Sequence, residues 1–182
     1  MPFTAGRPRV SDAVARWLAR RRVTLGLVAV IATLILAQPT WTAWRIGFVI
    51  AAAGEAVRVW AAGHLEKGRE VTRSGPYRWT RHPLYVGSSI MALGIVIAAR
   101  SMTVAMVAAI YMGSTLTAAI RMEEAFLSRA FGDSYDRYRE SRAEPSGRRF
   151  SLARAMRNRE YRAAAGLAAG FALLALKVSG YL

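Results

Sequence analysis

Five apolar runs, connected alternately by short linkers and by strongly basic segments, limit what this 182-residue chain can fold into. Each run is near the ~20 residues that an α-helix needs to cross a bilayer. A soluble domain has no use for so many uncharged stretches of Leu, Val and Ala. The pattern predicts an all-α integral membrane protein, a single membrane domain over residues 1–182 with about five transmembrane helices. These are expected at residues 23–37, 41–63, 84–99, 102–120 and 163–180.

The basic charge of the chain is distributed unevenly. It carries 26 Lys and Arg against 11 Asp and Glu, although 54% of its residues are hydrophobic. Of these 26 basic residues, 22 fall in three polar segments, residues 1–22, 64–83 and 121–162. Because Lys and Arg accumulate on the cytoplasmic side of membrane proteins, we expect a cytoplasmic N-terminus and a C-terminus outside. A nucleic-acid-binding protein would also be basic, but the long apolar runs disfavour that class.

Charged residues inside the run 41–63 need partners, since an isolated charge in a membrane is costly. Glu55 and Arg58 are three residues apart, share one face of a helix and are expected to form an ion pair. The chain has no cysteine and two histidines. We therefore expect neither thiolate chemistry nor a metal site.

Two of the runs are expected to form a tight antiparallel helical hairpin. Only Arg100-Ser101 separates residues 84–99 from residues 102–120, and so short a connection makes the two helices neighbours. The second helix of the hairpin has no stop signal before Gly132, so it should continue to Phe131. The start of the first helix and the end of the second then lie at the same level, on the cytoplasmic side.

An unusually polar stretch, residues 75–87, precedes and opens the first helix of the hairpin. Its Gly75-Pro76 predicts a turn, because proline fixes φ and the residue before it avoids the helical region. Pro83 suits the first position of a helix, which makes His82 the N-cap. The hairpin should then bring His82 and Tyr85 close to the polar end of the second helix, at Arg121, Glu123 and Glu124.

This end of the hairpin offers opposite charges to a ligand. The helix N-terminus favours an anion and the two acids favour a cation, so the site suits a ligand shaped like an amino acid. The same helix field disfavours an imidazolium, and we expect His82 to be neutral. Glu123 and Glu124 point about 100° apart. One should contact the ligand while Arg121 pairs with Glu124 at i, i+3.

Two motifs together resemble the isoprenylcysteine carboxyl methyltransferase family and its phospholipid methyltransferase relatives. The first is G-P-Y-R followed by R-H-P-L-Y-V-G, within residues 75–87. The second is Arg121 and Glu123-Glu124, followed by F-G-D-S-Y-D-R-Y at residues 131–138. The likeness covers residues 64–140, a methyltransferase-like core. The other parts are then a basic N-terminal segment, two spans, a basic cytoplasmic segment and a fifth span, at residues 1–22, 23–63, 141–162 and 163–180.

The resemblance implies a membrane methyltransferase that uses S-adenosylmethionine at a cytoplasmic site. Its partners would be the bilayer and a lipidic or prenylated acceptor, with no nucleic acid and no metal. Carried over position by position, the cofactor-binding residues would be Tyr77, His82, Pro83, Tyr85, Gly87, Glu123 and Glu124. The catalytic residues would be Arg81, Arg121 and Glu124.

The acceptor implied by the resemblance is the carboxylate of an isoprenylcysteine-like substrate. A phospholipid amine and a small thiol are alternatives within the same chemistry. An NADPH-dependent, sterol-reductase-like enzyme is a further alternative, because such enzymes share an Arg-His-Pro and Tyr pattern, although they are longer. A non-catalytic membrane scaffold is the third class. The basic residues 142–149 and the extra span depart from the family pattern, so contacts to the acceptor do not carry over there.

Overall fold

A computed structural model describes residues 10–140 and 146–181 and contains helices without any β-strand in these two ranges. The predicted all-α class is confirmed. Parts of the two predicted basic segments, residues 1–9 and 141–145, lie outside the described residues. The helices are α1 (Val10–Leu36), α2 (Trp41–Ala62), the 3-10 helix η1 (Gly75–Arg78), α3 (Pro83–Ala99), α4 (Met102–Phe131), α5 (Asp133–Arg139), α6 (Leu152–Arg157) and α7 (Tyr161–Val178).

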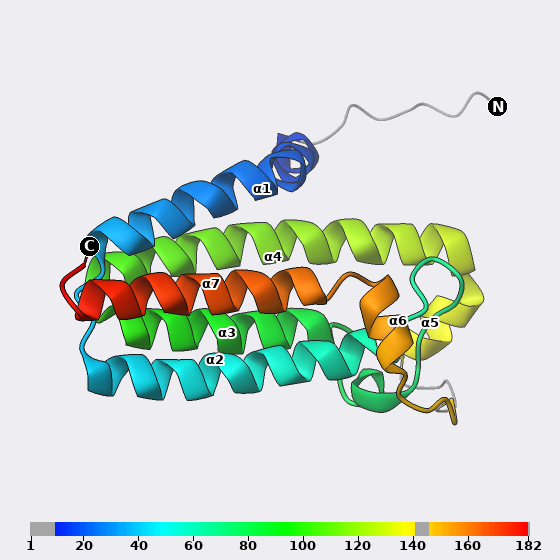
Figure 1. The fold of residues 1–182 in the computed structure, drawn as a ribbon. Coiled ribbons are helices and arrows are strands. Elements are labelled where there is room, and N and C mark those ends of the chain that lie inside the picture. Colours follow the sequence, from blue (N-terminus) through cyan, green and yellow to red (C-terminus); the bar gives the residue numbers. More distant parts are fainter. Residues whose placement is uncertain (1–9, 141–145, 182) are drawn as a thin grey trace.

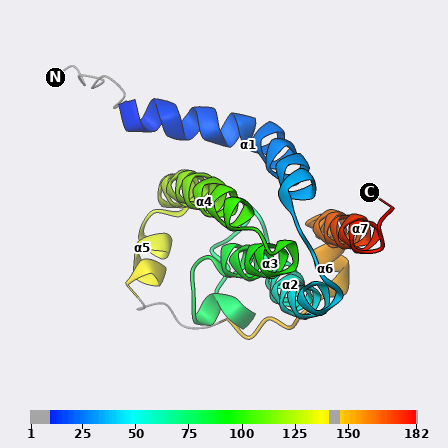
Figure 2. The same ribbon diagram turned by 90° about the vertical axis from the view of Figure 1, so that its left-hand side faces the viewer.

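Four long helices, α2, α3, α4 and α7, lie alongside one another (Figure 1). The end-on view of Figure 2 shows α1 leaning away from this bundle over α4. The α3–α4 turn and the C-terminus lie at one end of the bundle, and the α2–α3 loop, α5 and α6 lie at the other (Figure 1). Two of the three basic segments, residues 64–83 and the described part of 121–162, therefore lie at the same end of the bundle (Figure 1).

The predicted hairpin is confirmed. Arg100 turns the chain with a left-handed backbone, φ 48°, and the hydroxyl of Ser101 accepts a hydrogen bond from the backbone N–H of Val104 at the start of α4. Helix α4 continues over 30 residues to Phe131, as expected. Gly132, at φ 44°, ends α4 and also precedes α5.

Small residues let the backbones of α2 and α3 approach closely. A Cβ atom added to Gly94 would lie 2.5 Å from the carbonyl oxygen of Gly47 and 2.5 Å from the backbone nitrogen of Ala51. A Cβ atom on Gly87 would lie 2.7 Å from the carbonyl oxygen of Gly54. Membrane helices associate through such small-residue contacts, because lipid supplies no hydrophobic force between them.

Two helices of the described chain, α4 and α7, are long and apolar enough to cross a membrane. The apolar part of α1 (Thr24–Leu36) and the 17-residue α3 are shorter, while α2 carries Arg45, Glu55 and Arg58. Length and composition thus identify two candidate spans, fewer than the five that the sequence predicts. A five-span arrangement stays a prediction.

Candidate functional site

A cavity of about 1120 Å³ lies at the polar end of the bundle. Its walls come from the α2–α3 loop, α3 and α4, with contributions from α1, α2, α5 and the chain that enters α7. Pockets for small molecules usually measure about 300–1,000 Å³. This cavity therefore has room for a nucleoside-sized ligand together with part of a second molecule.

Four charged side chains from the two arms of the hairpin meet beside this cavity. The Nε2 atom of His82 lies 3.2 Å from Oε1 of Glu124, and its Nδ1 atom lies 3.7 Å from Oε2 of Glu123. Arg81 donates a hydrogen bond from Nη1 to the same Glu124 oxygen at 3.0 Å. The ring of Tyr85 stacks on that of His82, with centroids 5.6 Å apart. The predicted meeting of His82 with the two acids is confirmed, although about forty residues of chain separate them.

The pKa of His82 is shifted in the direction opposite to the one that a neutral ring requires. The pKa of His82 is raised above its ordinary value, because interactions first with Glu123 and then with Glu124 favour the imidazolium more than burial disfavours it. The helix N-terminus acts in the opposite direction, but two carboxylates at about 3 to 4 Å outweigh it. In the protonated form of His82, which the two acids favour, the cluster holds two positive charges and two negative ones.

The two adjacent acids have different positions. Glu123 lines the cavity, whereas Glu124 holds Arg81 and His82 in place through direct contacts. The expected pair of Arg121 with Glu124 is not made, because residues from the opposite arm of the hairpin occupy that carboxylate. Arg121 is exposed and is not part of the described cavity lining.

Of the other residues predicted to contact the cofactor, three line the cavity and one packs between two helices. Tyr77, Pro83 and Tyr85 line the cavity. Gly87 is not in the described lining; it is buried against α2, where an added Cβ would lie 2.6 Å from Cγ of Arg58. In this structure Gly87 therefore allows helix packing.

Two tyrosines close the wall of the cavity beside η1. The hydroxyl of Tyr138, on α5, donates a hydrogen bond to the carbonyl oxygen of Tyr77 at 2.7 Å. Burial raises the pKa of Tyr77 above its ordinary value and that of Tyr138 to about 12. Both phenols stay protonated at neutral pH, so neither can serve as a base there.

Sequence reasoning found only the Glu55–Arg58 pair of a second ionic centre, around Arg58, and missed its other partners. Arg58 forms the predicted ion pair with Glu55 at 3.5 Å and hydrogen-bonds the α3 residues Ser88 and Leu84. It also pairs at 2.5 Å with Glu160, which directly precedes α7. The only sequence signal was a charged residue inside an apolar run. That signal did not indicate a partner a hundred residues away.

These features define a class: a helical protein with apolar helices long enough for a membrane and a charged cavity at one end. The chain belongs to the phospholipid methyltransferase family, which matches residues 22–134. The resemblance drawn from the two motifs is thereby confirmed.

Three curated proteins are similar to this chain. A cobalt-zinc-cadmium resistance protein, CzcN of Cupriavidus metallidurans, is 32% identical over 67% of this chain and 62% of its own length. A nickel-cobalt-cadmium resistance protein, NccN of Alcaligenes xylosoxydans xylosoxydans, is 30% identical over 66% of this chain and 62% of its own length. The protein-S-isoprenylcysteine O-methyltransferase of Schizosaccharomyces pombe is 33% identical over 52% of this chain and 39% of its own length. The chain thus spans less than two thirds of each relative, and no solved structure matches it.

Proposed function

We propose that this protein transfers a methyl group from S-adenosylmethionine to a lipidic or membrane-associated acceptor, with an isoprenylcysteine-like carboxylate as the first candidate. One observation carries the proposal: Arg81, His82 and Glu123 present both signs of charge to a cavity of about 1120 Å³. Membership of the phospholipid methyltransferase family supports the same chemistry.

The cluster fits the charged end of S-adenosylmethionine. That end carries a carboxylate and an ammonium group, which require a cation and an anion side by side. Arg81 and His82 would bind the carboxylate, and Glu123 would bind the ammonium group. Glu124 would hold Arg81 and His82 in position from behind. When bound, the cofactor supplies an electrophilic methyl group at its sulfonium centre.

The protein's part in such a transfer is to align donor and acceptor and to exclude water. A carboxylate acceptor is already ionised and needs no base. The raised pKa values of Tyr77 and Tyr138 suit that case, because neither phenol accepts a proton at neutral pH. A phospholipid amine would first have to lose a proton, and it ranks second for that reason. A small thiol has the same requirement.

Titration of the purified protein tests the proposal against its alternatives. We expect S-adenosylmethionine and S-adenosylhomocysteine to bind at one competitive site, with S-adenosylhomocysteine as a product inhibitor, and NADPH not to bind. Binding of NADPH in place of both would instead support a sterol-reductase-like enzyme. Binding of none of the three would support a non-catalytic scaffold.

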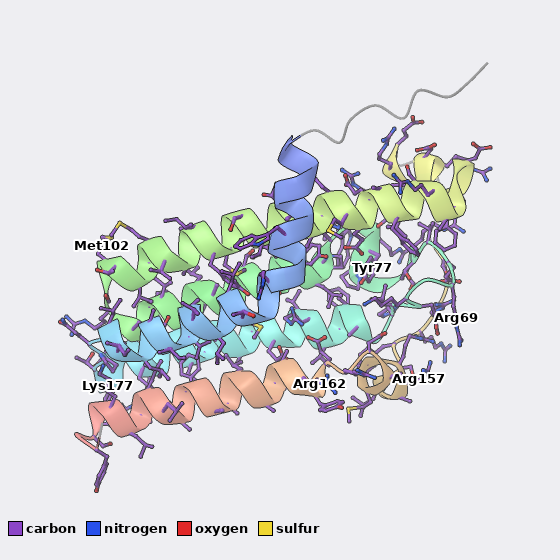
Figure 3. All side chains as sticks on the ribbon, turned by 90° about the horizontal axis from the view of Figure 1, so that it is seen from above. Arg69, Tyr77, Met102, Arg157, Arg162 and Lys177 are labelled. Carbon is purple, nitrogen blue, oxygen red and sulfur yellow. The ribbon has the colours of Figure 1, made fainter. Side chains whose placement is uncertain are left out.

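We also propose that all five long helices span the membrane, with the N-terminus in the cytoplasm, the C-terminus outside and the cavity opening towards the cytoplasm. In support, the labelled Arg69 and Arg157 lie at one end of the molecule, and Met102 and Lys177 lie at the other (Figure 3). Because the chain has no cysteine, single cysteines can report the topology. A membrane-impermeant maleimide added to intact cells should label Ser101→Cys and leave Arg69→Cys unlabelled; the reverse pattern would contradict this orientation.

A further inference from the structure

We propose that Arg159 and Arg162 form a subsite for an anionic group of the methyl acceptor, a carboxylate or a phosphodiester. This inference rests on the proposed function and names the part of the acceptor that the cavity recognises. Both arginines line the cavity, and they come from the segment that enters α7, away from the hairpin motifs. Figure 3 labels Arg162 at the beginning of α7.

The charges that line the cavity leave these two arginines available. Its lining carboxylates already have cationic partners within the described chain: Glu70 pairs with Arg148 at 2.7 Å, Glu123 with His82, and Glu160 with Arg58. Neither Arg159 nor Arg162 forms an ion pair with a carboxylate of residues 10–140 or 146–181. A guanidinium group on a cavity wall without an acid partner is suited to an anionic ligand, which it can bind through two parallel hydrogen bonds.

Contacts on both sides hold Arg159 at the cavity. The side-chain amide of Asn158 donates hydrogen bonds to the carbonyl oxygens of Ala62 and Leu65, at 2.9 Å each. On the other side, Glu160 is 6% exposed and pairs with Arg58. Between these anchors, Arg159 has a left-handed backbone, φ 61°. An arginine adopts this conformation only where its surroundings impose it.

Helix α6, which precedes this segment, is fixed to the end of α2 and to the α2–α3 loop as well. Arg154 donates to Glu66 at 2.8 Å and to the carbonyl oxygen of Gly63 at 2.6 Å. Thus the arginines near the cavity have two kinds of environment. Arg148 and Arg154 are engaged with acids of the loop, whereas Arg159 and Arg162 belong to the cavity wall and have no such acid among the described residues.

The charges on the cavity wall differ from one part to another, so different parts suit different ligand groups. The cluster at His82 is balanced and can bind the two opposite charges of an amino acid. Arg159 and Arg162 add two positive charges for which the lining has no free acid. Lys67 adds a third positive charge to the lining. The two arginines therefore suit a purely anionic group, such as the carboxylate of a prenylated cysteine or the phosphate of a phospholipid headgroup.

Pairs of probes with and without an anionic group test this inference on the full chain in phosphatidylcholine nanodiscs. One pair is N-acetyl-S-farnesylcysteine and its neutral methyl ester. The second is dioctanoyl phosphatidylethanolamine and dioctanoylglycerol, which lacks the phosphate. Inorganic phosphate, used alone, tests for a site that takes the free ion.

For at least one pair, we expect the wild-type protein to bind the anionic probe about tenfold or more tightly than its neutral twin. The double variant Arg159→Gln/Arg162→Gln should reduce this preference to less than about twofold. The matched control Arg149→Gln/Arg157→Gln removes the same charge from the same basic segment. These two positions are exposed, as Arg159 and Arg162 are, but lie outside the described lining, so the control should keep the preference.

Three results would overturn the inference. Equal affinity of the wild-type protein for both members of each pair would show that the anionic group is not recognised. An equal loss in the control variant would show a general effect of surface charge. Arginine-dependent binding of inorganic phosphate without a preference for either lipidic anion would show a free-ion site.

Titration with S-adenosylmethionine in the same nanodiscs separates this inference from the proposed function. Arg159→Gln/Arg162→Gln should leave the affinity for S-adenosylmethionine within about twofold of the wild type, because the donor contacts lie at the His82 cluster. If S-adenosylmethionine does not bind while the anion preference persists, the proposed function fails and the subsite stands. If S-adenosylmethionine binds and the preference is absent, only the subsite fails.

Discussion

Helix α3 lies between α2 and α4 in the helical hairpin region, and its contacts with these two helices differ. Towards α2 it presents Gly87 and Gly94, seven residues apart, and the two backbones are in van der Waals contact. Away from this contact it lines a large cavity with residues such as Tyr85, and α4 lines the same cavity with side chains such as Leu116. One face of α3 therefore packs tightly against α2, in a contact called the α2–α3 seam below, and another face lines the ligand cavity.

This difference explains why the polar motif can lie at the mouth of an apolar helix. The α2–α3 seam fixes α3 without using its polar end, so His82 and Tyr85 remain available to meet α4. Substitutions on the two faces should then have separable effects, one on folding and the other on ligand binding.

The largest effect is expected in the α2–α3 seam. Gly94→Leu would place side-chain atoms where the backbone of α2 lies, 2.5 Å from the position of a Cβ. Overpacking against backbone that cannot move should cost about 3 kcal/mol or more and abolish the folded protein. The control is Gly113→Leu on α4, where an added Cβ has no neighbour within 4 Å. In size-exclusion chromatography in detergent, Gly113→Leu should elute as the wild type does, and Gly94→Leu should give no peak of folded protein. A wild-type peak for both variants would contradict close packing between α2 and α3.

The next largest effect is expected at the cavity wall. Glu123→Gln should weaken binding of S-adenosylmethionine about 10- to 100-fold, because it removes a charge-assisted hydrogen bond of ~1.5–3 kcal/mol. The folded yield should stay that of the wild type, since Glu123 is outside the α2–α3 seam. Calorimetric titration measures the affinity. An unchanged dissociation constant would remove Glu123 from the donor site.

A smaller effect is expected in the pH dependence of thermal stability. The pKa of His82 is higher in the folded protein than in the unfolded chain, so its protonated ring stabilises the fold. This contribution to the free energy of unfolding is complete at pH values below the ordinary imidazole pKa of ~6.5. That contribution is lost as the pH rises through the raised pKa of His82. The midpoint of thermal unfolding should therefore fall more steeply with rising pH in the wild type than in His82→Gln.

His64, the second histidine, does not affect the comparison between the wild type and His82→Gln. Burial lowers the pKa of His64, which is hydrogen-bonded to Ser74, so its contribution to stability has the opposite sign. His64 is present in both proteins, and its contribution cancels in the difference between them. Parallel pH profiles for the wild type and His82→Gln would contradict a raised pKa for His82.

The smallest effect is expected for Arg121. Arg121→Gln should change the affinity for S-adenosylmethionine by less than about twofold, since this side chain is exposed and outside the described lining. The matched variant Arg81→Gln should weaken it about tenfold, because Arg81 lines the cavity and bonds Glu124. An equal loss of affinity in Arg121→Gln and Arg81→Gln would show that Arg121 also belongs to the S-adenosylmethionine site.

The sequence was sufficient for the hairpin and for the meeting of His82 with the two acids, because a two-residue connection between long apolar runs leaves one arrangement. It could not determine the protonation of His82, which depends on carboxylates about 3 to 4 Å away from both ring nitrogens. It also assigned Glu124 the wrong partner, since local i, i+3 spacing does not reveal a competing arginine on the facing loop. The role of Gly87 in packing and the pairing of Glu160 with Arg58 depend on contacts between distant helices, which no local pattern encodes.

A double-mutant cycle tests the central claim most directly: that the imidazole of His82 and the carboxylate of Glu124 act as one unit in a donor site. The dissociation constant of S-adenosylmethionine would be measured for the wild type, His82→Gln, Glu124→Gln and the double variant. Because the two side chains are in contact at 3.2 Å, the double variant should lose little more affinity than the worse single variant. Losses that add fully, or no loss in any variant, would contradict the claim.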